Sequence, residues 1–172
     1  KSGRHALQTS RREVASSICG MQAATALRPL GAGRAWAAPP RIKIGQIGVG
    51  HAHASKLGVY RDSPDYEVVG IVEPDAVLRK QAESQAPFRD LPWLTEEQLL
   101  NTAGLQAVLV ETRVRDLLAT AQRAVAAGKH VHIDKPAGES LQQFKRILDD
   151  AARQKLLVQM GYMYRYNPGV VL

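Results

Sequence analysis

The 172-residue chain lacks the side chains and segments that several functions need. It has one cysteine, Cys19, which lies near the N-terminus, so the rest of the chain has no disulfide, no cysteine-ligated metal and no thiol nucleophile. Long hydrophobic runs are also missing. The apolar stretch at 14–27 is too short and too rich in small residues to span a bilayer, and we expect no membrane span.

Net positive charge is small beyond residue 37. The formal net charge is +7, and most of it comes from residues 1–37, which hold six lysines and arginines against one glutamate. The near-neutral remainder gives no electrostatic footprint for DNA or RNA, so we expect no nucleic-acid partner. The apolar content of 45% and charged content of 23% are those of an ordinary globular domain.

The first 37 residues have the composition of a targeting segment. Arg11 and Arg12 precede the weakly apolar run, and Ala35–Ala37 has the small-x-small form of a signal-peptidase site. This order resembles a twin-arginine export signal, which a receptor reads and which anchors nothing. The resemblance implies a periplasmic or otherwise exported protein. The alternative is a basic tail without function on a cytoplasmic protein.

After a linker at 38–40, strand-like and helix-like segments alternate. The strand-like runs are 41–49, 66–73, 105–112, 129–134 and 155–164. The helix-like stretches between them are 53–62, 75–86, 95–100, 115–128 and 140–154. Thr95 and Ser140 are expected as N-caps, and Gly128 as the residue that ends a helix. Apolar strands separated by helices predict an α/β fold, a doubly wound parallel sheet of the Rossmann type.

A glycine turn follows the first predicted strand. In the pattern G-x-G-x-x-G, the first glycine permits a tight turn, the second lets the backbone approach a pyrophosphate, and the third allows close helix–strand packing. Gly48 and Gly50 fill the first two positions, and His53 takes the third. A histidine there crowds the contact unless the helix starts slightly displaced and Ala52 or Ala54 supplies the close approach.

Glu73 ends the second predicted strand, 23 residues after Gly50. A carboxylate at this point accepts hydrogen bonds from the ribose hydroxyls of an adenosine and repels a 2′-phosphate, so the pattern favours NAD over NADP. The alternative is a turn that binds nothing, with Glu73 as a solvated strand end.

Four of the five histidines fall in two H-x-H pairs, His51/His53 and His130/His132. Alternate strand residues share a face, so a metal site is conceivable. His130 begins a strand whereas His51 follows the end of another, and no acidic cluster completes either pair in the sequence. We therefore expect no metal, with His51 lining the cofactor turn and the second pair packing in its strand.

The stretch "AAGKHVHIDKPAG" at 126–138 is more specific. Together with "IGQIGVGHAHA" at 44–54 and "GIVEPD" at 70–75, it closely resembles the N-terminal domain of the Gfo/Idh/MocA oxidoreductases, whose hallmark strand ends in Glu-Lys-Pro or, as here, Asp-Lys-Pro. The stretch "GYMYRYNPGV" at 161–170 resembles the crossover where that family leaves its Rossmann domain. The resemblance implies a dinucleotide-binding domain at 41–164 and the start of a crossover at 165–172.

The resemblance also implies roles for individual residues. Lys135 is the expected catalytic residue, which contacts substrate and cofactor, and Pro136 follows it in a bond that is cis in many members. Arg165 and Asn167 are expected substrate contacts. The expected cofactor-binding residues are Gly48, Val49, Gly50, His51, Ala52, His53, Glu73, Thr112, Asp134, Lys135 and Pro136.

Two departures from the family pattern matter. Where the family has Thr-Pro-Asn-x-x-His, residues 112–117 keep only Thr112, and Arg113 and Arg115 are free to reach an acidic group or to face water. The chain also stops near the point where the family's C-terminal substrate domain begins, and we expect a fragment or a truncated gene model. That missing domain would carry the catalytic acid and histidine and the contacts of a homo-oligomer.

The expected function is therefore the NAD-binding half of an oxidoreductase that acts on a hydroxyl of a sugar, inositol or similar polyol, inactive as an isolated fragment. One alternative is a glycosidase of the same family, in which NAD is consumed and regenerated. Another is a non-catalytic dinucleotide-binding or scaffold protein.

Overall fold

The computed structural model describes residues 39–162, 164–165 and 167–170. Its strands are β1 (Ile42–Ile47), β2 (Tyr66–Val72), β3 (Leu105–Val110), β4 (His130–Ile133) and β5 (Val158–Met160). Its helices are the 3-10 turn η1 (Ala54–Lys56) and α1 (Leu57–Asp62), α2 (Ala76–Ala82), α3 (Glu96–Leu100), α4 (Val114–Ala126) and α5 (Leu141–Arg153). Every predicted element is present, and the strands are shorter than predicted at their ends. The predicted export signal lies outside the described residues.

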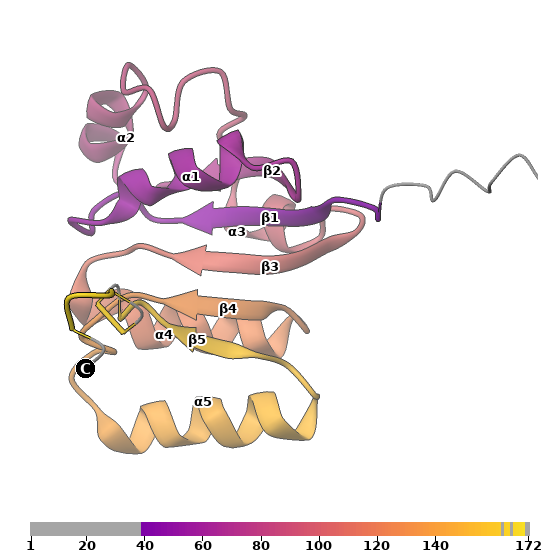
Figure 1. Ribbon diagram of the computed structural model, residues 1–172, viewed down its shortest axis with the longest axis vertical. Coiled ribbons are helices and arrows are strands. Elements are labelled where there is room, and N and C mark those ends of the chain that lie inside the picture. The colour runs from indigo at the N-terminus through magenta and orange to yellow at the C-terminus, as the bar shows by residue number, and fades with distance from the viewer. Residues whose placement is uncertain (1–38, 163, 166, 171–172) are drawn as a thin grey trace, which may run out of the picture. The chain divides into compact units, whose positions relative to one another are not determined.

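The five strands form one parallel sheet in the order β2-β1-β3-β4-β5, and Figure 1 shows their arrows pointing the same way. A short segment at 92–94 extends this sheet. Trp93 forms a parallel bridge with Ile71, and the Ile71 amide donates to the Pro92 carbonyl at 3.0 Å. The full order across the sheet is therefore that of a Rossmann domain, with its third strand reduced to one bridge. The sequence did not reveal this strand, because Pro92 interrupts the run.

Two separate hydrophobic cores cover the two faces of the sheet. Leu99 of α3, Leu117 of α4 and Ile147 of α5 belong to one core, whereas Leu57 of α1 and Ala82 of α2 belong to the other. Helices on both faces confirm the doubly wound architecture. Among the described residues, no helix is long and apolar enough to cross a bilayer.

The helices begin where the sequence provides caps. Thr95 accepts from the Gln98 amide while the Gln98 side chain returns to the Thr95 amide, and Ser140 accepts from the Gln143 amide at 3.2 Å. These contacts satisfy amides that have no partner within the helix. Gly128 follows α4 with a φ of 72°, a conformation that glycine adopts without strain. The three predicted caps are confirmed.

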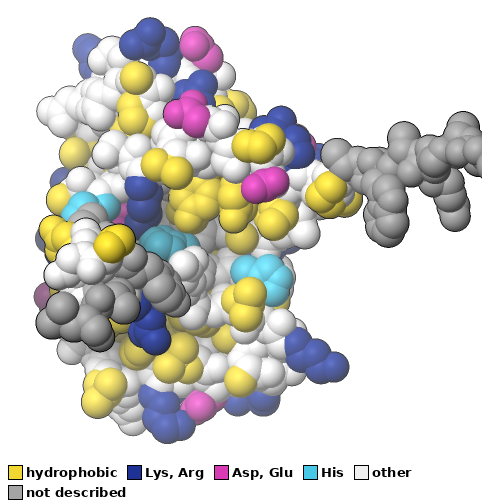
Figure 2. Space-filling model, viewed as in Figure 1, with side chains coloured by type: hydrophobic (Ala, Val, Ile, Leu, Met, Phe, Trp, Pro, Cys, Tyr) yellow, Lys and Arg dark blue, Asp and Glu magenta, His cyan; other side chains and the backbone are white. Residues whose placement is uncertain are grey.

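Strand β4 shows that one face of the sheet is covered less at this end. Val131 and Ile133 are buried beneath α4 and α5, whereas His130 and His132 on the other face are half-buried. Figure 2 views this second face and shows hydrophobic and histidine side chains at its surface.

Strand register places the site. Ile47 is paired with both Val72 and Val110, Val110 is paired with Ile133, and Ile133 is paired with Met160. These five residues form one row across the sheet. The residues that follow them therefore share its carboxyl edge, where ligands of open α/β sheets bind. They are Gly48, Glu73, Glu111, Asp134 and Gly161.

Candidate functional site: the carboxyl edge of the sheet

Gly48 begins the tight turn after β1. Its φ is 93°, and a Cβ there would lie 2.5 Å from the Thr112 amide nitrogen and 2.7 Å from the Glu111 carbonyl carbon. Both are backbone atoms, so only glycine fits at this position. The turn is fixed further by the His51 amide, which donates to the Glu111 carbonyl at 3.0 Å. The first glycine thus lets the β1 turn pack directly on the end of β3.

His53 stands where the third glycine is usual, and the helix starts late as expected. A 3-10 turn at Ala54–Lys56 precedes α1. Ala54 is 3% exposed and packs in the core, so it supplies the close helix–strand approach. The His53 ring is displaced to the side, where its Nδ1 lies 3.1 Å from Oδ1 of Asp134. The turn is therefore compatible with histidine.

Glu73 lies beside this turn at the end of β2. Its Oε2 accepts from the Val49 amide at 2.9 Å, and its Oε1 accepts from the Asp75 amide at 2.9 Å. A carboxylate offers about four lone-pair directions, so two remain for a ligand. Glu73 thus fixes the glycine turn and can still accept hydrogen bonds from a ligand. A solvated residue at the end of a strand would not hold the turn in this way.

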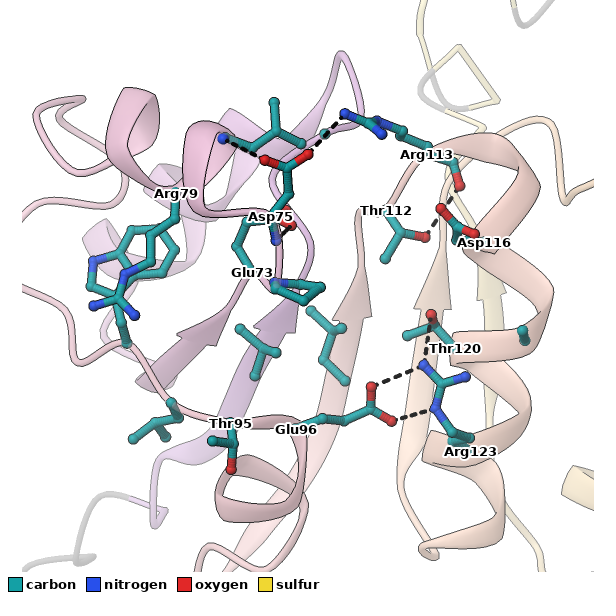
Figure 3. A pocket seen from close by; sticks show the side chains of 18 of the residues that line it. Glu73, Asp75, Arg79, Thr95, Glu96, Thr112, Arg113, Asp116, Thr120 and Arg123 are labelled. Atoms are coloured by element: carbon teal, nitrogen blue, oxygen red, sulfur yellow. Dashed lines mark hydrogen bonds and ion pairs between the residues drawn. The ribbon is translucent and has the colours of Figure 1, made fainter.

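A cavity of about 660 Å³ opens next to Glu73, between the ends of β1, β2 and β3 (Figure 3). Three predicted cofactor residues line it: Gly50, Glu73 and Thr112. The other lining residues come from the segment after β2, from the 93–98 segment and from α4. A cavity at the point where the chain departs in opposite directions from β1 is the usual nucleotide position in such sheets.

Arg113 closes one side of the cavity. Its Nη2 lies 3.2 Å from Oδ2 of Asp75. A dashed line marks this ion pair in Figure 3. Asp75 also caps α2, and its hydrogen bond from the Leu78 amide is the main cause that lowers its carboxyl pKa. Of the two predicted fates for the arginines, Arg113 reaches an acid, whereas Arg115 is largely exposed beside Asp116.

The opposite wall of the cavity carries a second ion pair. The Arg123 guanidinium on α4 donates to both carboxylate oxygens of Glu96, at 2.5 and 2.9 Å, and also to the hydroxyl of Thr120 at 3.2 Å. This geometry holds α3 against α4. Arg123 and Glu96 lie 27 positions apart, so no local pattern in the sequence indicates this pair.

A second group of polar side chains lies further along the same edge. Lys56 Nζ is 2.5 Å from Oε1 of Glu111, 2.5 Å from Oδ2 of Asp134 and 2.7 Å from Nε2 of His132. Both carboxylates are buried, at 0% and 1% exposed. We refer to His51, His53, Lys56, Glu111, His132 and Asp134 as the histidine–carboxylate cluster.

The two carboxyl groups of this cluster titrate in opposite directions. Burial raises the pKa of Glu111 from 4.5 to about 7, although its contact with Lys56 acts the other way. Burial also disfavours the charged form of Asp134, but hydrogen bonds from Lys56 and His53 outweigh it and hold the pKa of Asp134 well below its usual range. Burial and the Lys56 charge lower the pKa of His132. Environment thus separates two chemically similar acids.

This cluster corrects two predictions about the histidine pairs. The expectation that no acid accompanies them is wrong, because Glu111 and Asp134 lie between His51, His53 and His132. His132 is also not simple strand packing. Of the four histidines in the two pairs, His130 alone lies outside the cluster, at the start of β4, where its Nδ1 accepts from the Leu157 amide at 2.9 Å. Glu111 gave a signal in the sequence, since it directly follows an apolar strand.

Lys135 follows β4 and is exposed, and its bond to Pro136 is cis as the resemblance implied. Its backbone is held by two cluster residues: its amide donates to Oδ1 of Asp134 at 2.6 Å, and its carbonyl lies 3.2 Å from Nε2 of His51. The cavity and Lys135 are thus linked through the glycine turn. Ala52 is exposed in that turn.

The predicted substrate residues Arg165 and Asn167 lie in turns beyond β5. Oδ1 of Asn167 accepts from the Gly169 amide at 2.8 Å, so this side chain closes a local turn. The Arg165 amide donates to the Tyr162 carbonyl at 3.1 Å. Their contact with substrate stays a prediction.

Comparison with known proteins agrees with this geometry. Residues 42–162 match the oxidoreductase family with an NAD-binding Rossmann fold, Gfo/Idh/MocA. An inositol 2-dehydrogenase of Agrobacterium fabrum is 33% identical over 145 residues, which are 76% of this chain and 39% of the relative. Inositol 2-dehydrogenase 3 of Saccharopolyspora erythraea is 30% identical over 136 residues, 74% of this chain and 38% of that protein.

Solved structures show the same fold. The 3-ketoreductase KijD10 of Actinomadura kijaniata, crystallised with TDP-benzene and NADP, has a TM-score of 0.65 and 25% identity, over 76% of this chain and 41% of its own. An NAD-binding protein of Listeria innocua has a TM-score of 0.61 at 22% identity, over 71% of this chain and 35% of its own.

This chain spans about two fifths of the length of these curated relatives. The family match covers the sheet, the glycine turn, Glu73 and the Asp-Lys-Pro segment. The chain belongs to the Gfo/Idh/MocA oxidoreductases, of which it contains the NAD-binding Rossmann domain.

Proposed function

We propose that the protein is an NAD-dependent oxidoreductase that transfers a hydride between the cofactor and a hydroxyl of a sugar, inositol or similar polyol. The single observation that carries the cofactor preference is Glu73, whose carboxylate is fixed at the cavity by two backbone amides. The 2′-phosphate of NADP would be repelled by this negative charge, whereas the ribose hydroxyls of NAD would donate to the remaining lone pairs of the carboxylate. The polyol rests on the inositol dehydrogenases among the relatives.

The residues present fit a dinucleotide. Gly48 leaves room for the backbone turn that approaches a pyrophosphate, and Gly50 lines the cavity beside it. The turn leads from the end of β1 into η1 and α1, so this helical segment begins at the carboxyl edge of the sheet. When bound, the dinucleotide supplies the hydride acceptor or donor.

Lys135 is the proposed catalytic residue. It follows β4 at the carboxyl edge, and its backbone is held by Asp134 and His51. An ammonium there donates to a substrate hydroxyl oxygen and stabilises negative charge as the proton leaves.

A calorimetric titration of the full chain with NAD and with NADP tests the cofactor assignment. We expect saturable heat with NAD, weaker binding of NADP, and a loss of about tenfold in NAD affinity in Glu73→Gln, because an amide accepts fewer ribose hydrogen bonds than a carboxylate. Glu83→Gln, on the exposed end of α2, is the matched control and should bind as the unmodified chain does. A folded chain that binds neither nucleotide would contradict the proposal and favour a scaffold role.

We also propose export through the twin-arginine-like leader, on the evidence of Arg11, Arg12 and Ala35–Ala37. Fusion of residues 1–40 to a reporter that is active only outside the cytoplasm tests it. Replacement of both arginines by lysine should abolish the signal, and unchanged export would contradict the proposal.

A further inference from the structure

The H-x-H pair of the glycine turn lies against a buried carboxylate. Nδ1 of His53 is 3.1 Å from Oδ1 of Asp134, and Nδ1 of His51 is 3.7 Å from Oδ2 of the same side chain. Donor atoms of the three residues all lie within 4.8 Å of one another. Ligands of a tetrahedral zinc ion with bonds of about 2.1 Å are separated by about 3.4 Å, so these spacings suit one ion.

The hydrogen bonds of His51 define which ring nitrogen is free of a proton. Its Nδ1 accepts from the His53 amide at 3.2 Å, so the proton is on Nε2, which points to the Lys135 carbonyl at 3.2 Å. A histidine that binds a metal commonly donates its other N–H to a backbone carbonyl in this way. Nδ1 also lies 3.6 Å from Oε2 of Glu111 and 3.7 Å from Oδ2 of Asp134. Because this nitrogen has a single lone pair, a metal ion bound to it would replace the hydrogen bond from the His53 amide.

Glu111 provides an independent observation. Its side chain is 0% exposed, and its Oε2 lies 3.6 Å from Nδ1 of His51. No described residue donates a hydrogen bond to this oxygen. A buried carboxylate oxygen without a hydrogen-bond donor is costly, and a cation between Glu111 and His51 would satisfy it.

When Glu111 and Asp134 are both ionised, the cluster has one more negative charge than it has permanent cations. Glu111 and Asp134 are two buried acids, and among the described residues only Lys56 forms ion pairs with them as a permanent cation. Lys56 Nζ lies between Glu111, His132 and Asp134, so an ammonium already occupies the centre of that second possible metal group. The His51 side of the cluster has no such occupant.

We propose that His51, His53 and Asp134 bind one divalent transition-metal ion, with Glu111 as a second, neighbouring acid. Two imidazoles and one carboxylate are a ligand set that zinc, iron, cobalt and manganese all accept. The ion would lie next to the Lys135 carbonyl. This site does not depend on dinucleotide binding, and either can be absent without the other.

The test is zinc binding by the full chain after treatment with a chelator. Isothermal titration with zinc chloride should give one site per chain, and zinc should raise the midpoint of thermal unfolding. His53→Gln removes a ligand from a half-exposed position, so the variant should fold, and we expect its zinc affinity to fall by about a hundredfold. His130→Asn, at the other end of β4, is the matched control and should bind as the unmodified chain does.

Nuclear magnetic resonance of the unmodified chain gives a readout that needs no variant. Zinc should shift the ring signals of His51 and His53 and leave those of His130 in place. Absence of binding of zinc, cobalt or manganese would overturn the proposal. So would equal zinc affinity in His53→Gln, or ring shifts confined to other histidines, since each places the metal elsewhere.

Discussion

The nucleotide cavity and the histidine–carboxylate cluster lie on the same edge of one sheet but are built differently. The cavity depends on short local patterns: a glycine turn after β1 and an acid at the end of β2. The cluster unites side chains from the 51–56 segment and from the ends of β3 and β4, with His51 and Asp134 83 positions apart. Charge is correspondingly exposed at the cavity and buried in the cluster.

This difference predicts which substitutions affect ligand binding and which affect the stability of the fold. At the cavity the acids accept hydrogen bonds from backbone amides or pair with exposed arginines. Substitutions there should therefore change ligand affinity more than the free energy of unfolding. In the cluster one lysine serves two buried acids, so substitutions there should act on folding first.

Lys56→Met should have the largest effect on folding. It leaves Glu111 and Asp134 buried without their shared cation, and breaking a buried ion pair from one side costs about 4 kcal/mol. Urea denaturation measures the loss. The double variant Lys56→Met with Glu111→Gln should recover part of it, because one charge is then gone. Strictly additive losses would show that the two residues are not coupled.

Gly48→Ala should destabilise the chain by about 3 kcal/mol, since the added Cβ meets backbone atoms of Thr112 and Glu111. Gly128→Ala is the matched control: it has a similar positive φ, but nothing lies within 4 Å of its added Cβ. It should cost only about 1 kcal/mol for the left-handed conformation. Equal losses in the two variants would remove the argument for close approach at the turn.

Glu111 predicts an unusual pH dependence in chelator-treated protein. Its pKa is about 7 in the folded chain, against an ordinary value of 4.5 that applies to the unfolded chain, so the folded chain holds this proton more tightly. The free energy of unfolding should therefore fall as pH rises from about 4.5 to about 7, and Glu111→Gln should flatten that fall. Denaturation at a series of pH values measures it. A slope unchanged in the variant would assign the effect to another group.

Arg113→Ala should have the smallest effect. The ion pair with Asp75 is 46% and 37% exposed, and exposed pairs contribute about 0.5 kcal/mol or less. Thermal unfolding should be nearly unchanged, and NAD affinity should change less than in Glu73→Gln. A large loss of affinity would make Arg113 a direct cofactor contact.

The sequence predicted most of the fold and half of the site. Alternating apolar strands and capped helices are local patterns, and the Gly48 turn with Glu73 is a pattern of known spacing. The strand at 92–94 was not predicted, because a single bridge beside Pro92 is too short to show a strand's pattern of apolar residues. The histidine–carboxylate cluster was not predicted, because Lys56, Glu111 and His132 are brought together by strand register, which a single sequence does not reveal.

The most direct test of the central claim, that this edge of the sheet binds a dinucleotide beside Glu73, is an amide chemical-shift map of the full chain titrated with NAD. We expect the largest shifts at the Gly50, Asp75 and Thr112 amides, around the cavity between β1, β2 and β3. Saturating shifts at these positions would place the adenosine where the structure predicts. Shifts confined to other parts of the chain, or none at saturating NAD, would contradict the account.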